Sequence, residues 1–201
     1  MASSAAPYGL KPLNLIGGQP YAGSTRQIKI ASGYGANIYN GSIVAIVAGG
    51  TIEIVTTNGD NSTPFPAGTI GVFVGCTYTD PNSKQKLFSQ YWPTGTVASD
   101  AMAYVVDDPD CLFQAQADGA VTQADLGQNT HLAAVQSTST GSTTTGNSTS
   151  AVTATTNTTS GFAFRIVDFV DAPGSEIGDA ATDLIVKFNP DAHSYTNKTG
   201  I

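Results

Sequence analysis

MAYVVDDPDCLFQAQ, residues 102–116, contains the pattern from which most of this chain is expected to be built. Two apolar runs flank four residues that hold three aspartates and a proline. Short apolar runs rich in β-branched and aromatic residues, bounded by Asp and Pro, are typical of strands joined by a turn. The stretch therefore predicts a β-hairpin in which Asp107 to Asp110 form an exposed turn, and Cys111 and Phe113 lead the chain back into the core.

Runs of the same kind occur on both sides of this stretch. Gly49-Gly50 separates SIVAIVA from TIEIVT and predicts a hairpin with a two-residue loop. GFAFRIVDFV changes parity after Ile166, which indicates a β-bulge or burial on both faces. Further strands are expected at 26–30, 69–79, 83–92, 131–136, 150–156 and 183–188. Roughly ten short strands joined by turns predict an all-β fold, either a β-sandwich or a jelly-roll-like barrel.

The composition agrees with a fold that contains little helix. Charged residues make up 11% of the 201 residues, and 22 residues are glycine. Glu, Lys and Arg are good helix formers, so their scarcity disfavours helices. One short helix is expected near 122–130, with Thr122 as its N-cap and Asp125 near its start.

The chain is expected to form one domain. Residues 26–189 make the β domain, residues 1–25 an extended N-terminal arm and residues 190–201 a C-terminal tail. Within the domain, 17 of the 24 residues at 137–160 are Ser or Thr and none is charged. This composition fits a flexible loop, but the many threonines also allow a long exposed β-hairpin.

The arm carries more large apolar groups than a free tail needs. Its prolines and glycines interrupt regular structure, while its apolar side chains are expected to bury against something. The partner is this domain, another subunit or another protein. The predicted partner-binding residues are Tyr8, Leu10, Lys11, Leu13, Leu15, Ile16 and Tyr21.

The charge pattern bears on the kind of partner. The formal net charge is -7, and clustered Lys and Arg are missing, so nucleic-acid binding is not expected. The only charged side chains among residues 1–52 are nevertheless cations, namely Lys11, Arg26 and Lys29. This asymmetry arises either by chance or because the two ends of the chain meet different partners. No apolar run is long enough to span a membrane, and the N-terminus lacks the apolar core of a signal peptide.

The chain offers little for catalysis. Its two histidines are expected to be packed (His131) and solvated (His193), and Cys76 and Cys111 are expected to be buried free thiols rather than a disulfide. No nucleophile motif, phosphate-binding loop or zinc-ligand spacing is present. The sequence therefore predicts no catalytic residue, no cofactor and no metal.

The acidic clusters leave one alternative open. Calcium prefers such oxygen ligands, but Asp and Pro also form ordinary turns, and no EF-hand spacing is present. Turns are therefore predicted, with calcium as the alternative. The residues concerned are Asp107, Asp108, Asp110 and Asp118, and later Asp168, Asp171, Glu176, Asp179 and Asp183.

The ordered set of segments resembles a family of tailed-bacteriophage head proteins, the capsid cement or decoration proteins. The resemblance covers residues 5 to about 193 and includes APYGLKPLNLIGG, GVFVGCTYTDP, AMAYVVDDPDCLFQAQ and FRIVDFVDAPGSEIGDAATDLIVKFNPDAH. Its most specific pieces are Pro7, Gly9, Leu10 and Pro12 in the arm, the Asp107–Pro109–Phe113 segment, and the DAPGSEIG turn.

The resemblance implies a non-enzymatic structural role. Such a protein binds the outer surface of the capsid in the virion, contacts the major capsid protein and associates with itself, commonly as a trimer. It implies a β-sandwich or jelly-roll-like core and no catalytic residues.

Two other functions stay open. One is a phage tail or receptor-binding protein, in which exposed Ser/Thr-rich loops would also occur. The other is a small β-barrel hydrolase that uses His131, or a sugar-binding module in which Tyr78, Tyr91 and Trp92 stack on a sugar.

Overall fold

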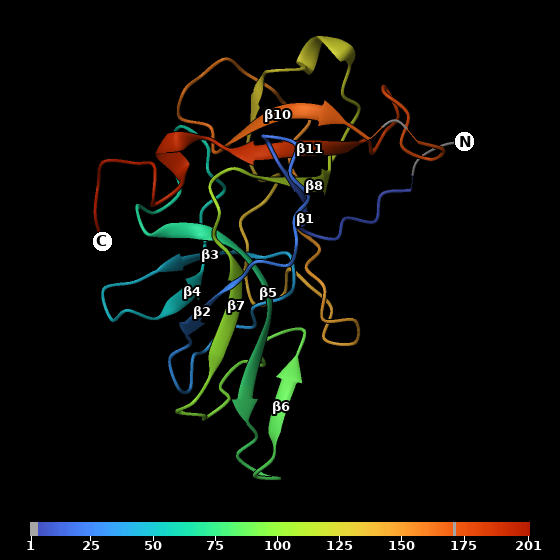
Figure 1. Cartoon of the computed structure of the whole chain (residues 1–201). Helices are drawn as coiled ribbons and strands as arrows, with labels where there is room; N and C mark the ends of the chain where they lie inside the picture. The colour runs from blue at the N-terminus through green and yellow to red at the C-terminus, as the bar shows by residue number, and fades with distance from the viewer. Residues whose placement is uncertain (1–3, 171) are drawn as a thin grey trace.

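The computed structural model describes residues 4–170 and 172–201 and places nearly all regular structure in two antiparallel sheets that pack together (Figure 1). Only two short 3-10 helices, η1 (Gln123–Asp125) and η2 (Pro190–Ala192), occur in the described residues. The predicted all-β sandwich with little helix is thus confirmed. The first sheet has the order β1 (Lys11–Leu15), β8 (Cys111–Gln116), β11 (Asp183–Phe188), β10 (Phe164–Phe169) and β9 (Asn129–Thr130). The second has the order β2 (Arg26–Lys29), β7 (Met102–Val106), β5 (Thr69–Thr79), β3 (Ile43–Ile46) and β4 (Ile52–Ile54), and β6 (Lys86–Ser89) also pairs with β5.

The predicted hairpin at 102–116 is wrong. Strand β7 pairs with β2 and β5, whereas β8 pairs with β1 and β11, so the aspartate-rich link carries the chain from one sheet to the other. Consecutive Val105 and Val106 point to opposite faces of β7, and both are buried. β7 is thus buried on both faces, and its neighbours within the sheet, β2 and β5, both precede it in the chain.

The second sheet is buried on both faces for part of its length. An inter-sheet core fills the space between the two sheets and contains Val72, Val106, Phe113, Phe164 and Phe188. A second core lies on the other face of the second sheet. It includes Ile38, Val44, Phe73, Trp92 and Val105. Loops rather than a third sheet cover this second core (Figure 1).

A predicted hairpin and a predicted bulge are both present, although the hairpin loop has another length than expected. The β3–β4 hairpin pairs Val44 with Ile54, but its turn runs from Val47 to Gly50 and is one residue longer than expected. Gly50 has φ 70°, a conformation that glycine adopts without strain and that suits a three-residue hairpin loop. In β10 the register shifts between Ile166 and Asp168, so the bulge is the alternative that the structure contains.

Segments expected as strands at 131–136 and 150–156 form only isolated bridges. Val152 bridges to both Ala117 and Leu132 and is fully buried. The backbone of Ser148 also donates to Asn40. The Ser/Thr-rich segment 137–160 is therefore irregular in backbone but packed against the sandwich at several points.

The short helix expected near Thr122 is present as η1. Backbone N–H and side-chain hydroxyl of Thr122 both donate to Asp125 Oδ2, at 2.8 and 2.9 Å. These two hydrogen bonds close a single turn. The helix ends there because η1 has no buried residue, so no apolar face packs against the core to stabilise further turns.

Candidate functional site: the N-terminal segment and the inter-sheet link

The N-terminal segment is partly anchored in its own domain. Leu10 is 1% exposed and belongs to the inter-sheet core, and β1 pairs with β8 through Lys11 and Gln114. Leu15 and Tyr21 pack against the same core, and Leu13 is half-buried. Of the partners left open by the sequence, this domain therefore takes up much of the apolar surface. Residues 11–15 form an edge strand of the first sheet.

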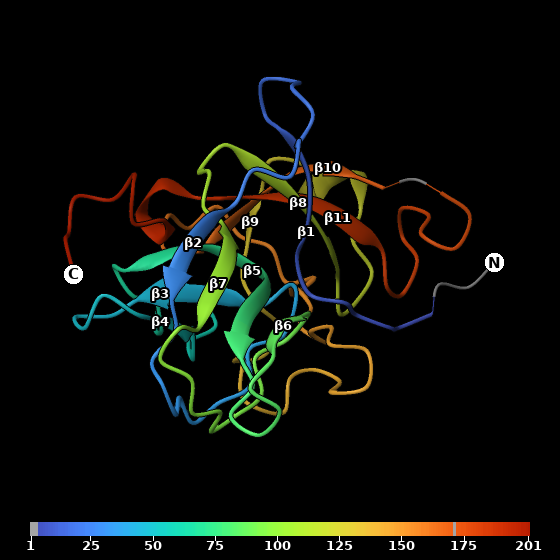
Figure 2. The ribbon, with the colours of Figure 1, turned by 60° about the horizontal axis from the view of Figure 1, so that its bottom comes forward.

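The loop after β1 carries an exposed apolar side chain. The backbone N–H of Gly18 donates to Leu15, and that of Leu15 donates to Gln19, which turns the chain back on itself. Ile16 lies in this turn, is 52% exposed, and donates its backbone N–H to the carbonyl of Asp110 at 2.9 Å. Figure 2 shows this loop projecting from the body of the molecule. The sandwich thus holds Ile16 in a fixed place and leaves its side chain free.

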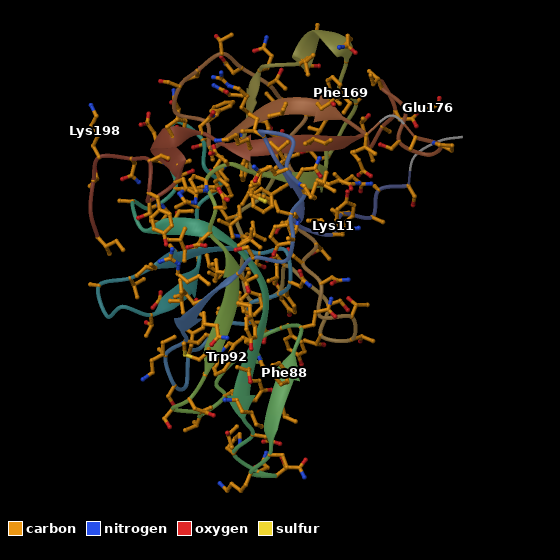
Figure 3. The ribbon with its side chains drawn as sticks, in the orientation of Figure 1. Lys11, Phe88, Trp92, Phe169, Glu176 and Lys198 are labelled. Carbon is orange, nitrogen blue, oxygen red and sulfur yellow. The ribbon has the colours of Figure 1, made fainter. Side chains whose placement is uncertain are left out.

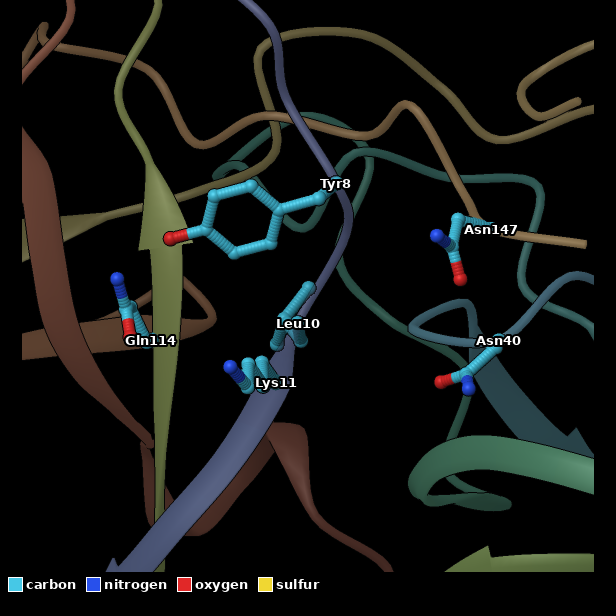
Figure 4. Close-up of a pocket in the computed structure, with 6 residues that line it drawn as sticks. All are labelled: Tyr8, Leu10, Lys11, Asn40, Gln114 and Asn147. Carbon is cyan, nitrogen blue, oxygen red and sulfur yellow. The ribbon is translucent and has the colours of Figure 1, made fainter. Parts of the chain in front are cut away.

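A pocket of about 390 Å³ opens beside the anchored part of the segment (Figure 4). Tyr8, Lys11 and Gln114 lie on one side of Leu10, and two asparagines lie on the other. Lys11 is the single charged residue among the lining residues, and the amide groups can donate and accept hydrogen bonds. The pocket is therefore suited to a polar group of a partner. Its lining residues are Tyr8, Leu10, Lys11, Asn40, Gln114 and Asn147.

Tyr8 supplies a proton donor at the wall of this pocket. Burial raises the pKa of its phenol well above the ordinary value of 10.0, and the nearby Asp183 carboxylate raises it further. Gln114 Nε2 donates to Asp183 Oδ2 at 3.0 Å, and the Tyr8 phenol lies close enough to the Asp183 and Gln114 side chains for both to shift its pKa. The phenol therefore stays protonated at neutral pH.

The inter-sheet link is the segment 107–110 between β7 and β8, and its carboxylates have structural partners. Asp107 Oδ2 lies 2.6 Å from Nε of Arg26 and accepts the hydroxyl of Tyr195 at 2.8 Å. The Arg26 guanidinium also lies 5.4 Å from the centroid of the Tyr195 ring. Asp108 accepts the backbone N–H of Asp110, as in an Asx turn. Asp107 therefore ties β2, the link and the C-terminal tail together.

The acidic residues do not gather into a metal site in the described part of the chain. Residues 4–170 and 172–201 contain no group of three or more His, Cys, Asp or Glu side chains placed to hold an ion. Asp110 pairs with Lys187 at 3.4 Å, and Asp179 accepts the backbone N–H of Glu176. Asp171, one of the calcium candidates, lies outside the described residues. The observed contacts are those of turns and ion pairs.

His193 is not solvated, contrary to the sequence-based prediction. It is 1% exposed and lies edge-on to Phe188, with ring centroids 5.7 Å apart. Burial lowers its pKa below the ordinary value of 6.5. The tail packs here because Ser194 donates its backbone N–H to Thr69 and Asn197 donates its side-chain amide to the carbonyl of Ala67.

The remaining candidates for chemistry are packed. Cys76 and Cys111 are free and buried, as predicted, and burial raises the pKa of each thiol to about 12. His131 is packed, as predicted: its ring lies edge-on to Phe162 at 4.8 Å.

Two of the three aromatic residues considered for sugar binding lie in the second core. Trp92 is fully buried and meets Tyr78 edge-on at 5.4 Å inside the second core. Tyr91 stacks on Tyr39. Trp92 and Tyr78 are therefore core residues, and their burial disfavours the alternative in which they stack on a sugar.

Sequence reasoning missed half of the pocket. Asn40, Gln114 and Asn147 come from three distant segments, and no local motif marks them. Their convergence depends on the paths of loops that the sandwich brings together.

Comparison of the chain with protein-family models, with curated proteins and with solved structures found no match. None of the helices in the described residues is long and apolar enough to cross a membrane.

Proposed function

We propose that this chain is a capsid cement or decoration protein of a tailed bacteriophage. It binds the outer surface of the phage head in the virion, links neighbouring units of the major capsid protein, and associates with itself. The role is structural and involves no catalytic step, cofactor or nucleic acid. The resemblance over residues 5 to about 193 supports this assignment, and the all-β sandwich agrees with the fold that the resemblance implies.

The presentation of Ile16 is the observation that carries the proposal. An isoleucine that is 52% exposed stands on a loop between β1 and Tyr21, which packs against the core, and its own backbone N–H is held by the carbonyl of Asp110. A fixed apolar group loses little conformational entropy when it binds. Lys11 lies close by in sequence and is exposed, which favours an acidic surface on the shell.

Weak contacts of this kind are sufficient for stable binding to the shell when one oligomer makes several of them. If an oligomer engages several shell sites at once, the later contacts form at a high effective concentration. The apolar area that each copy buries contributes roughly 25 cal/mol per Å² before ordering costs are subtracted.

Co-sedimentation of the purified chain with expanded shells that lack it tests the proposal. The wild-type chain is expected to sediment with the shells and to saturate, and Ile16→Ser is expected to weaken this binding. Val135→Ser is a matched control, because Val135 is 51% exposed and lies in a different segment. Failure of the wild-type chain to bind shells would contradict the proposal.

Deletion of residues 1–25 is not a suitable test. It would remove edge strand β1 and the buried Leu10, so loss of binding could follow from loss of the fold. Ile16→Ser changes an exposed side chain and leaves these elements in place.

A further inference from the structure

The second sheet extends beyond the sandwich and leaves side chains accessible on one face of β6, β7 and β2, whereas Thr77 on β5 between them is 4% exposed. Phe88 on β6 lies opposite Thr77 on β5, Thr77 lies opposite Met102 on β7, and Met102 lies opposite Lys29 on β2. Directly opposed residues share a face of a sheet, so these four side chains form one row. Tyr104, two residues after Met102, lies on the same face. We call this surface the platform; its residues are Lys29, Thr77, Lys86, Phe88, Met102 and Tyr104.

The platform presents an aromatic pair to solvent. Phe88 is 78% exposed and stacks on Tyr104, with ring centroids 6.5 Å apart and planes inclined by 16°. The position opposite Tyr104 on β5 is Gly75, which has no side chain to fill the space between the strands. An ordered and stacked but exposed phenylalanine on a sheet face is typical of a surface that a partner covers.

The platform carries two cations on an acidic protein, and one of them already has an intrachain partner, because Lys86 Nζ lies 3.9 Å from Asp100 Oδ2 in an exposed ion pair. Lys86 lies two residues from Phe88 on the same face of β6, and Lys29 ends the row on β2. The whole chain carries 15 acidic and 8 basic residues. A partner that covers Phe88 and also pairs with Lys29 must combine an apolar group with a carboxylate.

The chain itself carries such a combination in the loop between β10 and β11. Ile177 is 37% exposed and follows Glu176, which is also exposed, and Asp179 lies two residues further on. Figure 3 shows Glu176 at the upper right of the molecule and Phe88 far from it, in the lower half. One copy therefore cannot bring its own loop to its own platform, and the contact requires a second copy.

We propose that the platform of one copy binds the Glu176–Ile177 loop of a second copy, with Ile177 against Phe88 and Glu176 near Lys29 and Lys86. The two surfaces differ, so the contact is head-to-tail, and it closes into a ring or continues as a chain according to the rotation at each contact. This inference rests on the self-association stated in the proposed function and does not depend on shell binding.

The test is sedimentation equilibrium of the purified full chain over a range of concentrations, without shells. Phe88→Ser is expected to weaken self-association about tenfold or more, as is Lys29→Glu combined with Lys86→Glu. Val97→Ser is the control, because Val97 is 66% exposed and lies outside the platform. Thermal unfolding of each variant checks that the fold is retained.

A charge exchange makes the test specific. Glu176→Lys alone is expected to weaken association, and adding it to the Lys29→Glu and Lys86→Glu variant is expected to restore part of what that variant lost. Absence of recovery, or wild-type association in Phe88→Ser, would overturn this interface. A wild-type chain that stays monomeric would overturn self-association as a whole, while shell binding would still be decided by co-sedimentation.

Discussion

Asp107 and Arg26 form an ion pair where the chain passes from one sheet to the other, with 2.6 Å between Asp107 Oδ2 and Arg26 Nε. Tyr195 donates its hydroxyl to the same oxygen at 2.8 Å. The three residues come from β2, the inter-sheet link and the C-terminal tail. One carboxylate thus joins three segments that are far apart in sequence.

Asp107→Asn is expected to lower the free energy of unfolding by about 1–2 kcal/mol. The effect stays small because the Arg26 side chain is 60% exposed and water screens the ion pair. Urea denaturation measures the change. Asp191→Asn, at an exposed position, serves as the control, and equal midpoints for both variants would show that the contact does not stabilise the fold.

The strands could be predicted from the sequence better than their neighbours. Apolar runs marked β3, β5, β10 and β11, because strand burial leaves a local pattern. The pairing of β7 and β8 could not be predicted, since a short polar link serves equally well as a hairpin turn and as a passage between sheets. His193 was misassigned because its neighbours are polar, and its burial depends on Phe188, which lies on β11.

Substitutions at Leu10 and Ile16 are expected to differ in their effect on stability, because Leu10 anchors the N-terminal segment in the core whereas the Ile16 side chain is presented to solvent. Leu10→Ala removes a buried side chain and is expected to cost about 2–4 kcal/mol of stability. Ile16→Ala changes an exposed side chain and is expected to alter stability by no more than about 0.5 kcal/mol. Thermal and chemical denaturation of both variants checks this. A large loss of stability in Ile16→Ala would mean that Ile16 belongs to the core.

Gln136 is expected to be essential for holding the segment before the Ser/Thr-rich stretch. Its side-chain oxygen accepts the N–H of Ile43 at 2.9 Å, and its amide nitrogen donates to the carbonyls of Ile43 and Val55, each at 3.1 Å. Gln136→Ala would remove the side-chain partner of the Ile43 N–H and of the Val55 carbonyl, while the Ile43 carbonyl keeps the N–H of Val55. The expected cost is about 2–4 kcal/mol. Exposed Gln123→Ala is the control for denaturation. A cost equal to that of the control would contradict the contact.

His193 is expected to make stability depend on pH in the mildly acidic range. Because burial lowers its folded-state pKa, the unfolded chain binds the proton more readily. Its contribution is complete above the unfolded pKa of about 6.5 and is lost as the pH falls towards the folded-state pKa. Asp107, Asp108 and Lys187 are the charged groups that influence it.

Unfolding free energies measured between about pH 7 and pH 5 test this dependence. They should fall with pH in the wild-type chain and fall less in His193→Asn, which keeps an acceptor for the backbone N–H of Tyr195. The same slope in both proteins would show that another group titrates.

The number of copies in the particle tests the proposed role most directly. Quantitative mass spectrometry of purified virions measures the amount of this chain relative to the major capsid protein. A cement protein that repeats with the symmetry of the shell is expected in a fixed copy number per particle, on the order of the number of capsomers. It is also expected to be accessible to labelling from outside the particle. A handful of copies per particle would indicate a tail or receptor-binding protein instead, and absence from the virion would contradict the structural role altogether.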